Sequence, residues 1–180
     1  MYINITAHNT NVFMRIYLKL ANIFEPMIKS IEIIRKPRLH LLNFINDLSI
    51  EQLNKIPNGF NNNIIWNLGH MIAAQQGVCY KRAGLPTVID DNFFVTYKPD
   101  SKPERFYDSN ELKTIEELFV STLGQLEIDL ENNLFVNYTP WTTRYGVELS
   151  TIEEAIKFLP FHEGLHLGYI WALRRAVLAS

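Results

Sequence analysis

The sequence has 180 residues, of which 47% are hydrophobic, and its formal net charge is −2. This length suffices to bury one hydrophobic core but not two, so we expect a single domain. The near-neutral charge and the lack of a dense Lys/Arg block exclude the electrostatic signature of nucleic-acid or anionic-membrane binding.

Cys79 is the single cysteine, which excludes an intramolecular disulfide framework and cysteine-rich metal sites. It lies within a helical pattern and is interpreted as a packing residue. No apolar run approaches the roughly 20 residues that span a bilayer. We therefore expect a soluble protein of a reducing compartment, the cytoplasm.

Residues 1–26 are predicted to be an N-terminal extension, poorly ordered and with little structural role. Arg15 and Lys19 interrupt their apolar residues, and no small-residue cleavage site follows, which argues against a secretory signal. The domain is predicted to span residues 27–180.

The first predicted helix covers residues 28–48, where apolar residues recur at helical spacing, and Pro37 is expected to kink or divide it. Ser49 and Gln52 then form a capping-box pattern that predicts a short helical turn. A second helix is predicted from the Asn61–Asn63 run, which supplies capping oxygens, to Gly84. Residues 85–107 contain three prolines and no sustained periodicity, so they are predicted to form a long connection.

Asp108 and Glu111 predict a capping box for a third helix that ends near Glu131. A second irregular stretch, 138–146, precedes a fourth helix, for which Ser150 and Glu153 are the expected caps and which Pro160 should bend or restart. No strand pattern of convincing length is present. The expected fold is therefore all-α: a four-helix bundle with long irregular connections between helices.

His162 and His166 lie four residues apart within the apolar stripe of the fourth helix. This spacing places both imidazoles on one helix face, where they can chelate one ion. His70 lies in the second helix beside the small residues Ala73 and Gly77 and is the best candidate for a third ligand. His8 and His40 are interpreted as surface residues.

The segment from His162 to His166 matches the His-Glu-x-x-His pattern of zinc peptidases. Neither common peptidase class fits, because no acidic residue follows His166 and because the expected downstream glycine and histidine are Tyr169 and Ala172. Three neutral imidazoles instead predict an open site for zinc, nickel or another divalent metal. Glu163 is the candidate catalytic residue, as a base for metal-bound water or as an orienting group; the alternative is a structural bond to a histidine N–H.

From about Met27 onward the sequence resembles the DinB-like superfamily, named for damage-inducible bacterial proteins. The resemblance rests on Asn67-Leu-Gly-His70-Met, on Tyr145-Gly146, and on the segment from Phe161 to Gly168. It implies a four-helix bundle, often dimeric, with zinc or nickel held by the histidines at positions 70, 162 and 166. Some relatives are S-transferases or isomerases that use bacillithiol, mycothiol or glutathione, and many have no assigned reaction.

The leading hypothesis is a metal-dependent enzyme that acts on a small molecule, either as a transferase for a low-molecular-weight thiol or as a hydrolase. Phe93, Tyr97, Trp141 and Tyr145 are expected to line the mouth of its site, and Arg144 to meet an anionic group. A non-catalytic, metal-stabilised binding or stress-response module is the second hypothesis, and a metal-free helical interaction protein is the third.

Overall fold

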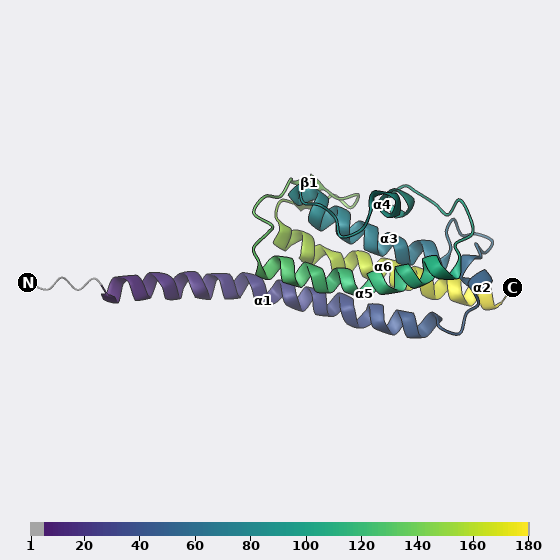
Figure 1. Cartoon of the computed structure of the whole chain (residues 1–180), viewed down its shortest axis with the longest axis horizontal. Helices are drawn as coiled ribbons and strands as arrows, with labels where there is room; N and C mark the ends of the chain where they lie inside the picture. Colours follow the sequence, from purple (N-terminus) through teal and green to yellow (C-terminus); the bar gives the residue numbers. More distant parts are fainter. Residues whose placement is uncertain (1–5, 180) are drawn as a thin grey trace, which may run out of the picture.

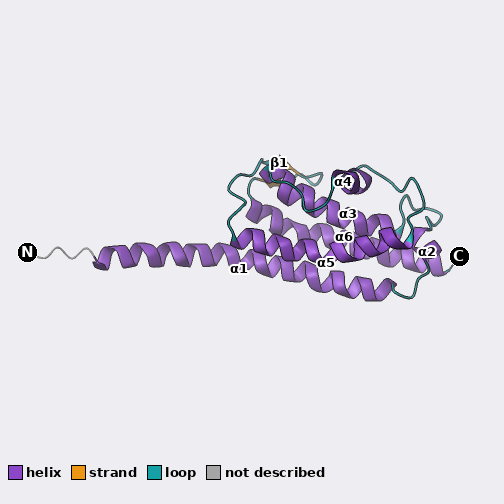
Figure 2. Cartoon of the chain, in the orientation of Figure 1, coloured by secondary structure: helices purple, strands orange, loops and turns teal. Residues whose placement is uncertain are grey.

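The computed structural model describes the backbone of residues 6–179 and the side chains of residues 24–179. The long helical segments of the bundle run along roughly the same axis (Figures 1 and 2). They are α1 (Thr6–Ile45), α3 (Ile64–Gln76) with its π-helical continuation η1 (Gly77–Lys81), α5 (Ser109–Glu131) and α6 (Ile152–Leu178). Helices α5 and α6 each pack against both α1 and α3. The all-α prediction is confirmed.

Helix α1 is longer than predicted and is not divided at Pro37, which lies within it together with Pro26. Pro37 lacks the amide hydrogen that would bond to the carbonyl of Ile33, so one helical hydrogen bond is missing. Ile33 is half exposed. Figure 1 shows the N-terminal part of α1 projecting beyond the other helices. The helix passes the predicted boundary at residue 26 without a break, and residues 1–5 and the side chain of His8 lie outside the described part.

Capping side chains set the helix starts much as predicted. Ser49 and Gln52 form the capping box of the short α2 (Ile50–Asn54), Asn63 caps α3, and Asp108 forms the capping box of α5 with Glu111. The cap of α6 is one residue later than expected: Thr151 accepts from the amide of Glu154, not Ser150 from that of Glu153. Pro160 lies within α6 without ending it.

Two small elements were missed. The connection predicted for residues 85–107 contains α4 (Asp91–Tyr97), which begins at the N-cap Asp90 and packs on α3. The stretch after α5 contains an antiparallel hairpin of β1 (Trp141–Thr142) and β2 (Glu148–Leu149). Both are too short to show a hydrophobic period.

The buried core has two apolar clusters along the bundle, the first including Leu41, Leu68, Phe119 and Ile170, the second including Ile34, Cys79, Leu123 and Leu159. Cys79 is fully buried, as its interpretation as a packing residue requires, and burial raises the pKa of its thiol to about 12. No helix in residues 6–179 is both long and apolar enough to cross a membrane.

Candidate metal centre

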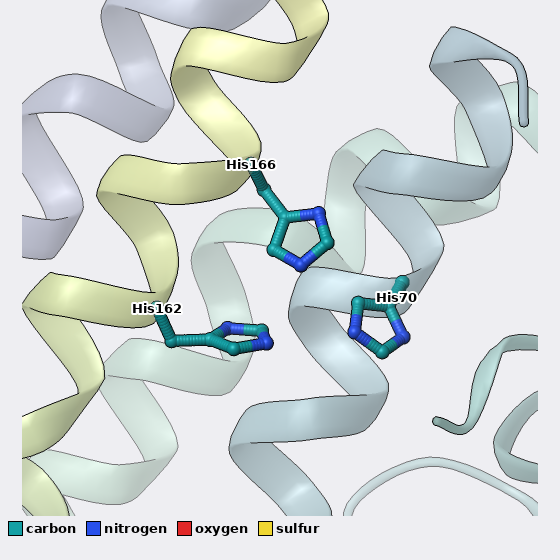
Figure 3. A group of neighbouring side chains, drawn as sticks. All are labelled: His70, His162 and His166. Carbon is teal, nitrogen blue, oxygen red and sulfur yellow. The ribbon is translucent and has the colours of Figure 1, made fainter. Parts of the chain in front are cut away.

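The structure brings His70, His162 and His166 together between α3 and α6 (Figure 3). One candidate ligand atom from each ring lies within 4.8 Å of the other two. The ring of His166 has its centroid 4.7 Å from that of His70 and 4.6 Å from that of His162. Residues from distant parts of the chain thus form one cluster of nitrogen donors.

His70 is fixed by a backbone carbonyl and an aromatic ring. Its Nδ1 lies 2.8 Å from the carbonyl oxygen of Tyr97, and its ring stacks on Trp66 with 4.8 Å between centroids. A carbonyl oxygen can only accept, so Nδ1 carries the hydrogen and donates it. The other nitrogen, Nε2, is therefore left with a free lone pair for a metal ion.

His166 is oriented in the same way by a side-chain amide. Its Nδ1 lies 2.9 Å from Oδ1 of Asn67, whose Nδ2 donates to the carbonyl of Asn63 at 2.7 Å. Because the amide nitrogen faces that carbonyl, its oxygen must face the imidazole. Nδ1 of His166 is consequently the donor, and Nε2 is again the bare nitrogen.

His162 supplies the strongest sign that the cluster takes a ligand. Its Nδ1 is buried and has no hydrogen-bond partner among the described residues. An unpartnered buried polar atom costs about 1–3 kcal/mol, so native sites rarely leave one without a purpose. A divalent ion held by three neutral nitrogens would fit this donor set, and zinc and nickel both accept imidazole readily.

Burial keeps all three imidazoles neutral. It lowers the pKa of His162 to about 3, and the neighbouring His70 adds to the effect. Burial and the two other histidines likewise lower the pKa of His166 to about 3. For His70 burial lowers the pKa against the opposing bond to Tyr97. Neutral imidazole is the form that ligates metals, so protons compete weakly here.

Glu163 lies between the two α6 histidines in sequence but does not face them. Its carboxylate accepts from Nη2 of Arg38 at 2.6 Å and from Nε at 2.9 Å, in the bundle interior. Arg38 is 1% exposed and also donates to the carbonyl oxygens of Phe119 and Met71. The role of Glu163 as a base stays a prediction. The alternative role, a structural bond to a histidine N–H, is filled for His166 by Asn67.

The three histidines form part of the wall of a pocket of about 800 Å³. Trp141 and Tyr145 line it as predicted, and Arg144, for which an anionic partner was predicted, also lines it. Phe93 and Tyr97 are absent from the lining because α4 turns them toward each other, and Phe94 takes their place. Other lining residues include Trp66, Phe158, Lys81, Arg82 and Asp100.

A sequence profile of the DinB superfamily matches residues 35–170, which include all three histidines. The chain belongs to the DinB superfamily. This confirms the resemblance inferred from the histidine-containing segments. A comparison with curated proteins returns no match.

Two residues of this DinB superfamily member had no role assigned from sequence: Asn67, which orients His166, and Arg38, which holds Glu163 in the bundle interior. Arg38 stands at a core position of α1, between Ile34 and Leu41, so a charged residue in an apolar stripe was an available signal. Asn67 follows Asn63 by one turn and precedes His70 by one, but its partner His166 is distant in sequence. His40, exposed and stacked on Phe44, lies outside the cluster as expected.

Proposed function

We propose that this protein is a metal-dependent transferase of a low-molecular-weight thiol, with zinc or nickel held by His70, His162 and His166. The observation that carries the proposal is that three neutral imidazoles form part of the wall of the pocket of about 800 Å³. A metal held by three histidines would keep coordination positions for a substrate, and the histidines line a pocket large enough for a small molecule.

The bound metal would supply Lewis acidity that lowers the pKa of a coordinated thiol and favours the thiolate. The protein residues act before that chemistry. Tyr97 and Asn67 hold the rings of His70 and His166 in the ligating tautomer. Trp66, Phe94 and Trp141 offer apolar surface for the molecule that receives the sulfur.

The transfer joins the thiol sulfur to an electrophilic carbon of the second substrate. The bond between that carbon and its leaving group breaks, the leaving group departs with the electron pair, and the thiol proton passes to solvent. This reaction needs no carboxylate base once the thiolate is formed.

Hydrolysis is less well supported because the nearest candidate base is occupied. Glu163 is buried, pairs through both carboxylate oxygens with Arg38 and does not line the pocket. Asp100 is the single acidic residue among the described residues of the lining. We therefore assign Glu163 to positioning α6 and not to proton transfer.

The test starts with metal content. Protein purified without a histidine tag should carry about one zinc or nickel ion per chain, and each of His70→Ala, His162→Ala and His166→Ala should lose it. The loaded protein should then accelerate conjugation of glutathione, cysteine or mercaptoethanol to monochlorobimane, and the histidine variants should not.

Wild-type protein that neither contains nor takes up these metals would overturn the proposal. Loaded protein that hydrolyses esters or amides but does not accelerate thiol conjugation would replace it with the hydrolase. Bound metal that raises stability without supporting either reaction would favour the non-catalytic module.

A further inference from the structure

The pocket that contains the three histidines is rich in positive charge. Lys81, Arg82 and Arg144 line it, against the one acidic residue Asp100 among its described lining. The whole chain carries a net charge of −2, so this excess of cations is local. A cavity lined by one sign of charge concentrates small ions of the opposite sign.

The two arginines differ from the lysine in what they contact. The Lys81 ammonium lies 3.7 Å from the Asp91 carboxylate and 4.1 Å from the centroid of the Phe94 ring. The Arg82 guanidinium stacks on Trp141 at 5.0 Å. Within the part of the chain that the structure describes, neither Arg82 nor Arg144 has a carboxylate in ion-pair range. Both therefore have guanidinium donors available to a ligand.

Backbone hydrogen bonds anchor the segments that carry both arginines. The amide of Thr139 donates to the carbonyl of Arg82 at 2.8 Å, and this bond ties the segment between α5 and β1 to the end of η1. Arg144 lies in the turn of the β1–β2 hairpin, which two bonds between Thr143 and the residues Gly146 and Val147 close. Gly146 has φ of +78°, the left-handed conformation that such a turn requires. A ligand would thus meet arginines on anchored segments.

Arg144 is also near the histidine cluster. Its positive charge is one of the causes that lower the pKa of all three imidazoles. A molecule with its sulfur at the histidines and its other end toward Arg144 would remain within the one pocket.

We propose that Arg82 and Arg144 form a carboxylate-binding subsite, and that the thiol substrate is a mercapto acid. This inference rests on the proposed function, since it names the substrate class of the same site. The guanidinium group matches the planar carboxylate with two parallel hydrogen bonds. A metal held by the histidines would take the sulfur, and the arginines that line the same pocket would take the acid.

The test uses full-length protein loaded with cobalt(II), whose absorption reports both metal uptake and ligation by sulfur. Mercaptopropionate, mercaptohexanoate and mercaptooctanoate are titrated, each beside the mercaptoalcohol of the same chain length. The variants are Arg82→Gln and Arg144→Gln, with Arg175→Gln, an exposed arginine outside the pocket, as the control for loss of one charge. Circular dichroism melts verify that each variant is folded.

At the best chain length the acid should bind about tenfold or more tightly than the alcohol, the size expected for hydrogen bonds between charged groups. Arg82→Gln and Arg144→Gln should each reduce this preference, and Arg175→Gln should retain it. Equal binding of acids and alcohols by the wild type, or a preference that neither pocket variant changes, would overturn the subsite while leaving the thiol transferase intact. Failure to bind cobalt, or cobalt binding without a sulfur band for any thiol, would instead overturn the proposed function itself.

Discussion

The side-chain amide of Asn67 orients the imidazole of His166, one of the three candidate metal ligands. Its nitrogen bonds to the carbonyl of Asn63 and its oxygen to Nδ1 of His166. The side chain is fully buried, so no solvent competes for these bonds. Groups that orient metal-ligating histidines in this way commonly contribute about 10–100-fold to metal affinity.

The variant Asn67→Leu removes both bonds while keeping a similar volume. We expect the dissociation constant for zinc to rise about 10–100-fold, because the ring of His166 loses its fixed tautomer. Competition titration against a colorimetric chelator measures this change. Asn67→Asp keeps an oxygen acceptor for the imidazole and should retain most of the affinity; equal losses in both variants would contradict the orienting role.

The lowered pKa values of the histidines also predict how the metal-free protein responds to acid. For His162 and His166 the folded-state pKa of about 3 lies below the ordinary value of 6.5, so the unfolded chain binds more protons between these limits. Stability from this source is present above pH 6.5 and is lost as the pH falls toward 3.

Urea unfolding of metal-free protein at pH values from about 7 to about 5 tests this linkage, since most carboxylates stay ionised over that range. The free energy of unfolding should decrease with falling pH. His162→Gln, which lacks one of the groups, should show a shallower decrease. A flat profile in the wild type would show that these imidazoles are not buried in the metal-free protein.

At the scale of elements, the short helix α4 positions His70 through its contact with α3. Gly69 makes this contact possible: a Cβ atom built there would lie 2.5 Å from the ring of Tyr97. The same Tyr97 offers its carbonyl to His70. The close approach of α4 to α3 is therefore part of the metal centre.

Gly69→Ala should destabilise the protein by about 1–3 kcal/mol, because the ring of Tyr97 must move to admit the methyl group. The movement should also weaken zinc binding, because it displaces the carbonyl that orients His70. Gly124→Ala in α5 is the matched control: its Cβ meets nothing within 4 Å, and alanine favours helix by about 1 kcal/mol. Chemical denaturation and zinc titration of both variants check this, and an unchanged Gly69→Ala protein would show that the contact is loose.

The elements that could be predicted from sequence were the long helices, in which apolar residues recur at helical spacing over many turns and a capping residue marks the start. The α5 capping box of Asp108 and Glu111 is an example, and the inward pair His162 and His166 was visible from the α6 period alone. Helix α4 was missed because seven residues give too few apolar repeats, although Asp90 is a good cap. The bond between Asn67 and His166 joins residues 99 positions apart, a pairing that no local pattern contains.

At the scale of the whole molecule, Arg38 connects all four long helices. It belongs to α1, pairs with Glu163 of α6, and donates to carbonyls of Phe119 in α5 and Met71 in α3. In sequence it lies between Ile34 of one apolar cluster and Leu41 of the other. A polar layer thus divides the core beside the metal centre.

Arg38→Met should lower the free energy of unfolding by about 3–5 kcal/mol, because it leaves the Glu163 carboxylate buried without a partner. The double variant Arg38→Met with Glu163→Leu should recover most of this loss, since an apolar pair needs no counter-charge. Denaturant unfolding of the two variants provides the comparison. A double variant as unstable as the single one would assign the loss to packing and not to charge.

The π-helical turn η1 affects which residues reach the pocket. The amide of Arg82 bonds to the carbonyl of Gly77, five residues earlier, where an α-helix would bond four residues back. Such a turn is equivalent to an inserted residue, which rotates everything after it by about 100° around the helix axis. Deleting one residue between Gly77 and Lys81 would restore the α-helical phase and carry Arg82 away from the pocket. A related chain with one residue inserted or deleted at this point would therefore keep the same metal ligands but accept a substrate of different charge.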